Sequence, residues 1–290
     1  MQLKGNDRCD AGRPTPSGPG GALTGKAEYT NMALLLSWND AMPIAISVVM
    51  ITRDAAATLA RALEATRGVD EVVIYDNGST DDTREIAAGY PNVSLHRGPF
   101  EGFGTTRRRA VACARNDWIF SLDADEAPDA DLIAALARWL PTAGPESVGV
   151  IHRQNWLMGR PVRRAGWGHD WLVRVFNRRH CNFNEARVHE SVATQESTRP
   201  ERLAGHLTHQ AVTDLSQFLE KINRYSELRA RSGRLKRYPV PLIFLKALFA
   251  FFRTYALQGG FLEGWRGLVI AVANANGVFW KYLKARIRPS

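Results

Sequence analysis

Residues 44–130 alternate between short, β-branched apolar runs and segments whose apolar residues recur at helical spacing. The runs predict buried strands, and the segments between them predict helices. The predicted strands are residues 44–51, 71–75, 93–95 and 118–122, and the predicted helices are residues 55–66, 80–88 and 105–115. Strands that alternate with helices are typical of an α/β fold with a doubly wound, mainly parallel sheet.

Polar side chains follow three of the predicted strands. Thr52 and Asp54 follow the first strand, Asp76 follows the second, and Asp123 and Asp125 follow the fourth. Because such sheets bind ligands at the carboxyl ends of their strands, these residues are candidate ligand contacts. The two carboxylates of the Asp-Ala-Asp segment are hard oxygen ligands that suit Mg²⁺ or Mn²⁺ completed by phosphate and water. A solvated acidic turn is the simpler interpretation of a lone Asp-x-Asp.

The rest of the chain has a different texture. Residues 148–192 contain short alternating runs with several glycines, which predicts a hairpin layer over the sheet, and the pattern is helical from residue 214 onward. Residues 1–42 are rich in Gly and Pro with little apolar periodicity, which predicts a flexible extension. The predicted organisation is therefore an extension at 1–42, a catalytic sheet domain at 43–213 and a basic, membrane-associating helical region at 214–290.

The net charge is distributed unevenly along the chain. The 290 residues carry a formal charge of +9, with 45% hydrophobic and 23% charged residues, an ordinary composition that excludes disorder and collagen. Residues 221–290 hold 14 Lys and Arg against Glu227 and Glu263, a net charge of +12, whereas residues 1–220 have a net charge of −3. The basic segment therefore predicts contact with nucleic acid, an anionic membrane surface or another acidic partner.

The basic segment also alternates its cations with Phe, Leu and Trp, as a helix lying in the plane of a membrane requires. A helical subdomain with a solvated basic face is the alternative. No apolar run reaches the ~20 residues of a spanning helix. The longest candidates are residues 240–252, interrupted by Lys246, and residues 267–280, interrupted by Asn274 and Asn276.

Three motifs connect the predicted strand ends to a known family. The sequence reads VVMITRD at 48–54, DNGSTDDT at 76–83 and LDADE at 122–126. These segments resemble, in order and on the same elements, the family 2 glycosyltransferases of the GT-A fold. That family has strands ending in Thr-Lys-Asn-Glu, in Asp-x-Gly-Ser-Thr-Asp-x-Thr and in Asp-x-Asp. The resemblance implies a GT-A nucleotide-diphospho-sugar transferase fold.

Further segments are similar to one branch of that family, the lipopolysaccharide core glycosyltransferases of the KdtX/WaaE-like type. These segments are GFGTTRR at 102–108, GWGHD at 166–170, RVFN at 174–177, VHE at 188–190 and KINRYS at 221–226.

The resemblance extends from residue 44 to about residue 285. It departs from the family at Asp54 and Ala55, where Asn-Glu is usual, and at Arg108, where Asn is usual.

The resemblance implies a nucleotide site. Thr52, Asp76 and Arg107 would hold the nucleotide, with Asp54 beside them. Asp76 would accept a hydrogen bond from the uracil imide, and Arg107 would face the diphosphate. A guanidinium stabilises the negative charge that develops on a diphosphate leaving group, although Arg107 also lies in a run of three arginines that is typical of a solvated helix face.

The resemblance also implies a divalent cation, Mg²⁺ or Mn²⁺, as cofactor. Asp125 would be the principal metal ligand, and Asp123 would contact the ribose or the metal. His189 is a candidate third ligand, although a lone histidine is more often structural.

Transfer to an acceptor hydroxyl also needs a general base. Asp170 aligns with an acidic residue of the family and is the first candidate, and Glu190 is the second. Trp167 is a candidate acceptor contact because aromatic rings stack on sugars, although core packing explains it equally well. Arg174, in the matching RVFN segment, is the other candidate acceptor contact.

These observations predict an inverting, metal-dependent glycosyltransferase of lipopolysaccharide or cell-envelope glycan biosynthesis. It would move a hexose from a nucleotide sugar, with UDP as the expected nucleotide, to a lipid-linked saccharide. We expect it to be cytoplasmic and peripheral on the anionic inner face of the membrane.

Other classes fit the sequence less well. A sugar-phosphate nucleotidyltransferase would need a Gly-rich loop after the first strand, and residues 52–57 contain no Gly. A nucleic-acid-binding protein fits the charge, but it leaves Asp76, Asp123 and Asp125 unexplained and no recognition motif is present, so no nucleic-acid partner is expected. A catalytically inactive membrane-surface scaffold remains an alternative.

Overall fold

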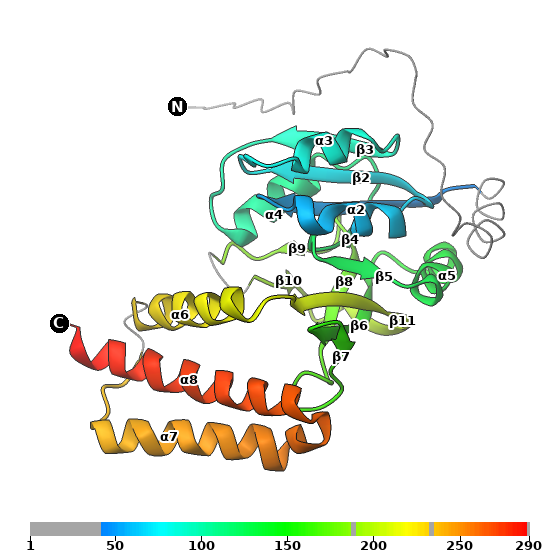
Figure 1. The fold of residues 1–290 in the computed structure, drawn as a ribbon. Coiled ribbons are helices and arrows are strands. Elements are labelled where there is room, and N and C mark those ends of the chain that lie inside the picture. The colour runs from blue at the N-terminus through cyan, green and yellow to red at the C-terminus, as the bar shows by residue number, and fades with distance from the viewer. Residues whose placement is uncertain (1–41, 187–189, 232–234, 289–290) are drawn as a thin grey trace, which may run out of the picture. The chain divides into compact units, whose positions relative to one another are not determined.

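The structure is a computed structural model that describes residues 42–186, 190–231 and 235–288. The predicted extension lies outside these ranges except for its last residue, and so does His189. The chain forms two compact units (Figure 1). Unit 1 comprises Met1–Ile151 and Val173–Gly205, and unit 2 comprises His152–Leu172 and His206–Ser290. This division differs from the predicted boundary between residues 213 and 214, and the functional domains stay a prediction.

Four parallel strands form the centre of unit 1. They are β1 (Ile44–Thr52), β2 (Val69–Asp76), β3 (Val93–Arg97) and β4 (Trp118–Ser121), in the order β3-β2-β1-β4. β1 and β2 are buried at most positions, as their continuous apolar sequences require. Their register places Thr52 beside Asp76. The predicted parallel arrangement is thus confirmed for these strands, and their carboxyl ends meet at one edge.

Beyond β4 the sheet becomes mixed. β8 (Trp171–Asn177) pairs antiparallel with β4, and the nine-stranded sheet continues in the order β8-β6-β11-β5. The added strands are β6 (Ser147–Leu157), β11 (Arg199–Val212), β5 (Glu126–Pro128) and β7 (Arg160–Pro161), which pairs with β6. The predicted hairpin layer over the sheet is therefore wrong, because β6 and β8 extend the sheet itself. β9 (Asn182–Phe183) and β10 (Val192–Ala193) form a separate antiparallel pair.

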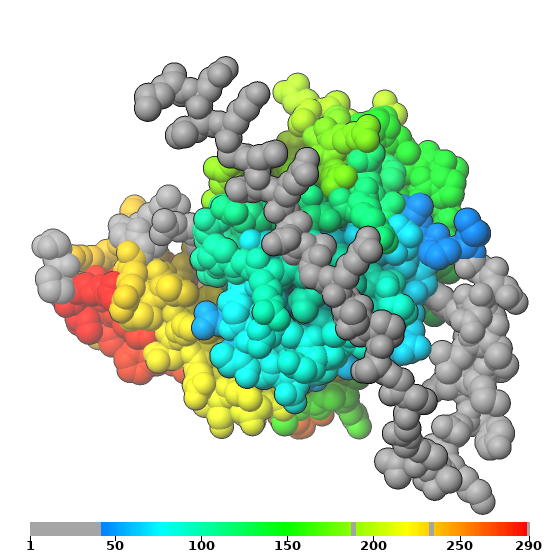
Figure 2. All heavy atoms as spheres, turned by 90° about the horizontal axis from the view of Figure 1, so that it is seen from above, coloured from blue at the N-terminus to red at the C-terminus, as the bar shows by residue number. Residues whose placement is uncertain are grey.

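Three helices of unit 1 lie near the predicted ranges, and a fourth, α5, was not predicted. They are α2 (Ala56–Ala65), α3 (Thr83–Ala88), α4 (Phe103–Ala112) and α5 (Ala130–Trp139), followed by the 3₁₀ turn Leu140–Thr142. α4 packs on β1 and β2 over a core that includes Val49, Val73 and Phe176. The segment from β2 to α4, cyan and teal in Figure 2, makes up much of the surface seen there.

α3 begins three residues later than predicted. Thr80, the first residue of the predicted helix, instead donates from its backbone N–H and its hydroxyl to Asp54, at 2.8 and 3.1 Å. Asp82 therefore stands at the N-cap position. Thr80 thus joins the loops that follow β1 and β2.

Unit 2 is mainly helical. It contains α6 (Leu215–Arg231), α7 (Val240–Phe252), a π-helical turn (Arg253–Leu257), a 3₁₀ turn (Gly260–Glu263) and α8 (Trp265–Ile287). α8 packs against both α6 and α7 and lies between them (Figure 1). Leu157, Val162, Ala165, Val212 and Ile270 form a buried cluster in this unit. The predicted helical C-terminal region is confirmed.

α7 buries one face and exposes an apolar one. Ile243, Ala247 and Ala250 are buried, and the exposed side carries Phe244, Leu245, Leu248, Phe249 and Phe252. Lys246, which interrupts the apolar run, lies over the rings of Tyr238 and Tyr282, at 4.5 and 5.8 Å.

The π-helical turn extends this apolar helix to Leu257. Among the described residues, Val240–Leu257 is by length and composition apolar enough to cross a membrane, and 22% of it is buried. The expectation that no segment is long enough therefore fails, because the helix does not end at Phe252.

Candidate functional site

The Asp76 carboxylate organises the turn that follows β2. One oxygen accepts the backbone N–H groups of Gly78 and Ser79, at 3.2 and 3.0 Å. The other accepts the hydroxyls of Ser79 and Thr52, the latter at 3.2 Å. A carboxylate offers about four lone-pair sites, so these donors occupy all of them, and Asp76 is 1% exposed. In this conformation a uracil imide would have to replace or share one of these donors to form the predicted hydrogen bond with Asp76.

Asp54 holds the loop after β1 against the same turn. Its φ is 51°, in the left-handed region that Asp tolerates better than most residues. The Asp54 N–H donates to the Ser79 hydroxyl at 2.9 Å, and its carboxylate accepts from Thr80. The hydrogen bond from the Thr80 N–H is the largest cause that lowers the pKa of Asp54 below its ordinary value. Asp54 thus positions the loop at the predicted nucleotide site.

Two buried arginines hold the Asp123 carboxylate beyond β4. Arg107 Nη2 donates to one carboxylate oxygen, and Arg174 Nη2 donates to the other at 3.0 Å. Arg107 comes from α4 and Arg174 from β8, and they are 5% and 8% exposed. The Asp123 side chain itself is 31% exposed. Each of its oxygens therefore keeps a lone-pair site beyond its guanidinium bond.

Ser121 and two further carboxylates complete this network. Arg107 donates to Ser121 Oγ at 2.9 Å and to Glu190 Oε1 at 3.0 Å. Arg174 donates to Glu126, which is fully buried, at 2.5 Å. Arg174 Nε is buried and has no partner among the described residues. An ordered water or an ion usually satisfies a buried N–H of this kind.

Opposing effects set the charge states in this network. Burial tends to raise the pKa of Asp123, but Arg107 and Arg174 outweigh it and hold the pKa well below its ordinary value. Burial tends to lower the pKa of Arg174, but Glu126 and Asp123 together raise it above the ordinary arginine value. Asp123 and Arg174 are therefore both ionised near neutral pH.

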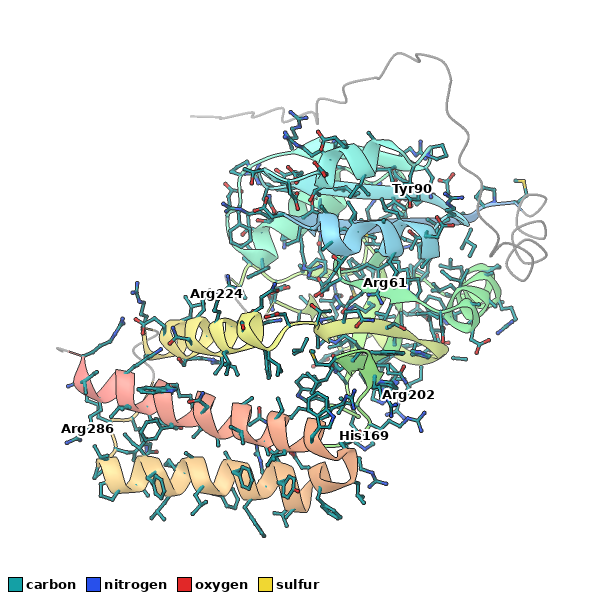
Figure 3. The ribbon with its side chains drawn as sticks, in the orientation of Figure 1. Arg61, Tyr90, His169, Arg202, Arg224 and Arg286 are labelled. Atoms are coloured by element: carbon teal, nitrogen blue, oxygen red, sulfur yellow. The ribbon has the colours of Figure 1, made fainter. Side chains whose placement is uncertain are left out.

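Asp125 lies beside this network and is partly exposed. Its carbonyl oxygen accepts from Arg61 Nη2 of α2 at 2.8 Å (Figure 3). Among the described residues no three His, Cys, Asp or Glu side chains form a metal cluster. Asp123 and Asp125 nevertheless fit a divalent cation, because one or two carboxylates with substrate phosphates are the usual Mg²⁺ ligands and Asp123 keeps free lone pairs. The predicted third ligand, His189, lies outside the described residues.

Asp170 and Trp167 belong to unit 2. They line a cavity of about 370 Å³ together with Asn155, His209 and Lys221. Asp170 Oδ2 accepts from Arg153 Nε at 2.8 Å and from Asn155 Nδ2 at 3.1 Å. Its other oxygen, Oδ1, accepts no hydrogen bond from the described residues. The Trp167 ring makes an edge contact with Phe218, with ring centroids 6.3 Å apart.

The structure therefore groups the predicted residues differently from the sequence analysis. Thr52, Asp54 and Asp76 share one loop pair, whereas Arg107, Asp123 and Glu190 share the charged network. Arg174 was predicted to contact the acceptor. It is instead buried in ion pairs with Asp123 and Glu126, because β8 pairs directly with β4.

Sequence reasoning missed Ser79, Ser121 and Glu126. Ser79 lies within the quoted DNGST motif, and Glu126 directly follows the Asp-x-Asp, so both had a local signal. Ser121 had none beyond its place at the end of a strand. Sequence reasoning also missed Arg153 and Asn155, the partners of Asp170, because they lie on β6, 17 and 15 residues away in the sequence.

The mixed sheet, its helices and its charged strand ends define a protein of GT-A-like glycosyltransferase fold. The model of Glycosyl transferase family 2 matches residues 47–190. These residues therefore belong to glycosyl transferase family 2, and the chain is a glycosyltransferase.

Two relatives align over most of the chain. One is the lipopolysaccharide core biosynthesis glycosyltransferase LpsC of Rhizobium meliloti (strain 1021), which is 28% identical over 264 residues covering 84% of this chain and 95% of LpsC. The other is an uncharacterized glycosyltransferase of Rickettsia typhi (strain ATCC VR-144 / Wilmington), which is 24% identical over 260 residues covering 83% of this chain and 86% of that protein. Among solved structures, S. aureus TarS 1–349 has a TM-score of 0.44 at 14% identity, covering 83% of this chain and 90% of that one.

Proposed function

We propose that this chain transfers a hexose, with inversion, from a UDP-linked donor to a lipid-linked saccharide of the cell envelope. The observation that carries the proposal is the Arg107–Asp123–Arg174 network at the end of β4 in a family 2 domain. The relationship to LpsC, named for lipopolysaccharide core biosynthesis, supports this acceptor class. The family match favours glycosyl transfer over the alternative of sugar-phosphate nucleotidyl transfer.

In this proposal the two arginines receive the diphosphate of the donor. Arg107 uses three of its five N–H groups on Glu190, Ser121 and Asp123. Its remaining N–H groups are donors for phosphate oxygens, and Arg174 adds a second positive charge beside them. Because the protein already fixes both guanidiniums, they stabilise the charge that develops on the leaving diphosphate without reorganising.

Asp123 and Asp125 would hold a divalent cation against the same phosphates, and that cation would supply further positive charge to the leaving group. Asp125→Ala is expected to abolish stimulation by Mn²⁺. Asp131→Ala, which removes an exposed carboxylate in the first turn of α5, is the matched control and is expected to leave it unchanged. Equal stimulation of the Asp125→Ala and wild-type proteins would exclude the metal role.

Asp170 is the proposed general base. Arg153 and Asn155 hold one of its oxygens, and the other accepts no bond from the described residues of the cavity that Trp167 also lines. That cavity is the proposed acceptor site. Glu190, tied to Arg107, is assigned the positioning of that guanidinium instead.

The two carboxylates make different kinetic predictions. Asp170→Asn is expected to lower kcat by roughly 10²- to 10⁴-fold with donor binding retained. Glu190→Gln is expected to raise the KM for the donor more than it lowers kcat. The reverse pattern would assign the base to Glu190.

The proposed location is the cytoplasmic face of the membrane. The apolar face of α7 is exposed, and residues 221–290 carry a net charge of +12, which together suit an anionic lipid surface. Contact with the membrane would bring a lipid-linked acceptor to the enzyme.

The decisive experiment uses the full chain with Mn²⁺. A thermal-shift screen of nucleotide sugars identifies the donor, which is expected to raise the melting temperature. Transfer to a membrane lipid extract is then followed, and NMR of the product determines its anomeric configuration. Retention of configuration would exclude the inverting mechanism. Donor binding without transfer to any lipid-linked saccharide would favour an inactive scaffold.

A further inference from the structure

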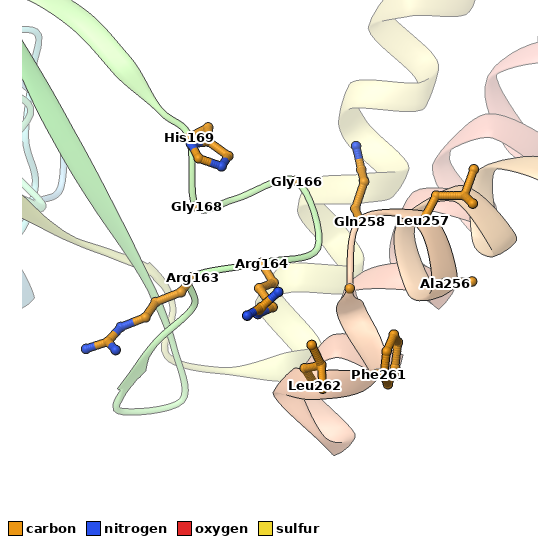
Figure 4. A pocket seen from close by; sticks show the side chains of 11 residues that line it. Arg163, Arg164, Gly166, Gly168, His169, Ala256, Leu257, Gln258, Phe261 and Leu262 are labelled. Carbon is orange, nitrogen blue, oxygen red and sulfur yellow. The ribbon is translucent and has the colours of Figure 1, made fainter.

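Unit 2 contains a cavity of about 840 Å³ between the loop at residues 163–169 and the turn at residues 256–262 (Figure 4). The loop contributes Arg163, Arg164 and His169. The turn contributes apolar side chains, including Phe261 and Leu262. One cavity thus offers cations on one wall and an apolar surface on the other, which suits an amphiphilic anion.

The shape of the loop is built into the backbone. Ala165 and Gly166 both adopt left-handed conformations, with φ of 57° and 81°, which is uncommon for a residue with a side chain. The Ala165 N–H donates to the Gln258 carbonyl at 2.9 Å, which joins the loop to the turn. A Cβ on Gly168 would lie 1.7 Å from the Arg163 carbonyl oxygen. The two walls are therefore fixed relative to each other.

The positive charge in this cavity is not neutralised locally. Arg163 and Arg164 are exposed, and neither guanidinium forms an ion pair with a described residue. Glu263, the acidic residue of the turn, instead accepts the backbone N–H of Arg163 at 3.0 Å. In Figure 4 the Arg164 side chain lies between the loop and the turn.

The apolar wall continues into the exposed face of α7. Leu257, Phe261 and Leu262 are more than half exposed, and the π-helical turn connects them to Phe252 at the end of that face. An apolar chain leaving the cavity would therefore meet further apolar surface.

We propose that this cavity binds the phosphate headgroup of an anionic membrane lipid. Arg163 and Arg164 donate charge-assisted hydrogen bonds to the phosphate, His169 lines the same side, and the acyl chains lie along Leu257, Phe261 and Leu262. The inference rests on the proposed contact between α7 and the membrane, and it is independent of glycosyl transfer. The site would fix the orientation of unit 2 on the lipid surface, because it binds a single headgroup instead of responding to the average charge of the membrane.

The test measures binding of the full chain to vesicles of phosphatidylcholine with and without phosphatidylglycerol. The double variant Arg163→Ala/Arg164→Ala is expected to lose roughly 30-fold in affinity for the anionic vesicles, since each cation near the surface contributes about 1 kcal/mol. Its melting temperature is expected to match wild type, because both side chains are exposed. Affinity for neutral vesicles is expected to stay unchanged.

The matched control is Arg138→Ala/Arg202→Ala, which removes the same charge from exposed positions that neither line the cavity nor belong to residues 221–290. Arg138 lies in the last turn of α5, and Arg202, labelled in Figure 3, lies on β11. The control is expected to lose less than about threefold. Equal losses of affinity for anionic vesicles in both variants would overturn the proposed headgroup site, because the two pairs of charges would then contribute only to the general attraction between protein and lipid.

Two further arms separate the remaining outcomes. Inorganic phosphate is tested as a competitor. If it raises the melting temperature of wild type but not of Arg163→Ala/Arg164→Ala, and if it displaces the vesicles, the lipid headgroup is the wrong ligand and the cavity is a free-phosphate site. Equal wild-type binding to neutral and anionic vesicles would overturn the headgroup site but leave the contact through α7. Absence of binding to any vesicle would overturn both the headgroup site and the membrane contact through α7. Donor binding and transfer to a soluble acceptor would still test the glycosyltransferase proposal.

Discussion

Asp76 ends β2 and Asp123 follows β4, the strands on either side of β1, yet the protein surrounds their carboxylates in opposite ways. Asp76 accepts four bonds from uncharged groups and is almost fully buried. Asp123 accepts one bond from each of two buried guanidiniums and is partly exposed. The same residue type at equivalent strand ends therefore serves two purposes.

The difference lies in what remains available for a ligand. Four neutral donors already bond to Asp76, so that carboxylate shapes the turn after β2, and a ligand would have to replace or share one of them. Asp123 keeps unused lone pairs, and the guanidiniums that hold it keep unused N–H groups. A position at a strand end identifies candidate residues, whereas the partners decide which of them can contact a ligand.

The largest effect is expected from Asp123→Ala. It leaves the buried Arg107 and Arg174 without their shared carboxylate, and removing one partner of a buried ion pair typically costs about 3–5 kcal/mol. Transfer should fall at least ~100-fold because the guanidiniums lose their fixed positions. Urea denaturation and steady-state kinetics measure the two effects. Wild-type stability in Asp123→Ala would show that the network does not support the fold.

Acidification should produce a smaller loss of stability, through protonation of the Asp123 carboxylate. Burial tends to raise the pKa of Asp123, but Arg107 and Arg174 hold it below its ordinary value. The ionised carboxylate therefore stabilises the folded protein fully above about pH 4, and this stabilisation is lost as the pH falls further. Urea denaturation between pH 6 and pH 3 is expected to show a steeper decline for wild type than for Asp123→Asn. Parallel declines in the free energy of unfolding of the two proteins would mean that Asp123 does not contribute to the pH dependence of stability.

Asp76→Asn is expected to act on the turn rather than on chemistry. Its amide NH₂ would face the hydroxyl and N–H donors that the carboxylate now accepts, which should lower the free energy of unfolding by about 1–3 kcal/mol. The KM for the donor should rise modestly, with kcat nearly unchanged. Wild-type stability with loss of donor binding would instead support the direct uracil contact predicted from the sequence.

The sequence predicted the strand ends well and their partners poorly. Thr52, Asp76 and Asp123 could be located because buried parallel strands have a continuous apolar pattern that stops at a polar residue. Arg174 could not be assigned, because it is 51 residues from Asp123 and reaches it only through the antiparallel pairing of β8 with β4. Long-range strand pairing depends on tertiary packing, which local periodicity does not record. The helical tail was equally readable, and its alternation of cations with Phe and Leu also anticipated the exposed apolar face of α7.

Thr52→Val should give the smallest effect, since it removes one of the four donors to Asp76 while keeping the shape of the side chain. The loss of a single hydrogen bond predicts about 0.5–1.5 kcal/mol of destabilisation, measured by urea denaturation. Thr105→Val on α4, where the hydroxyl makes no hydrogen bond among the described residues, is the matched control and should change stability less. A loss of donor affinity greater than this destabilisation would mean that the freed lone pair, or Thr52 itself, contacts the nucleotide, and the distinction between the saturated Asp76 and the available Asp123 would then fail.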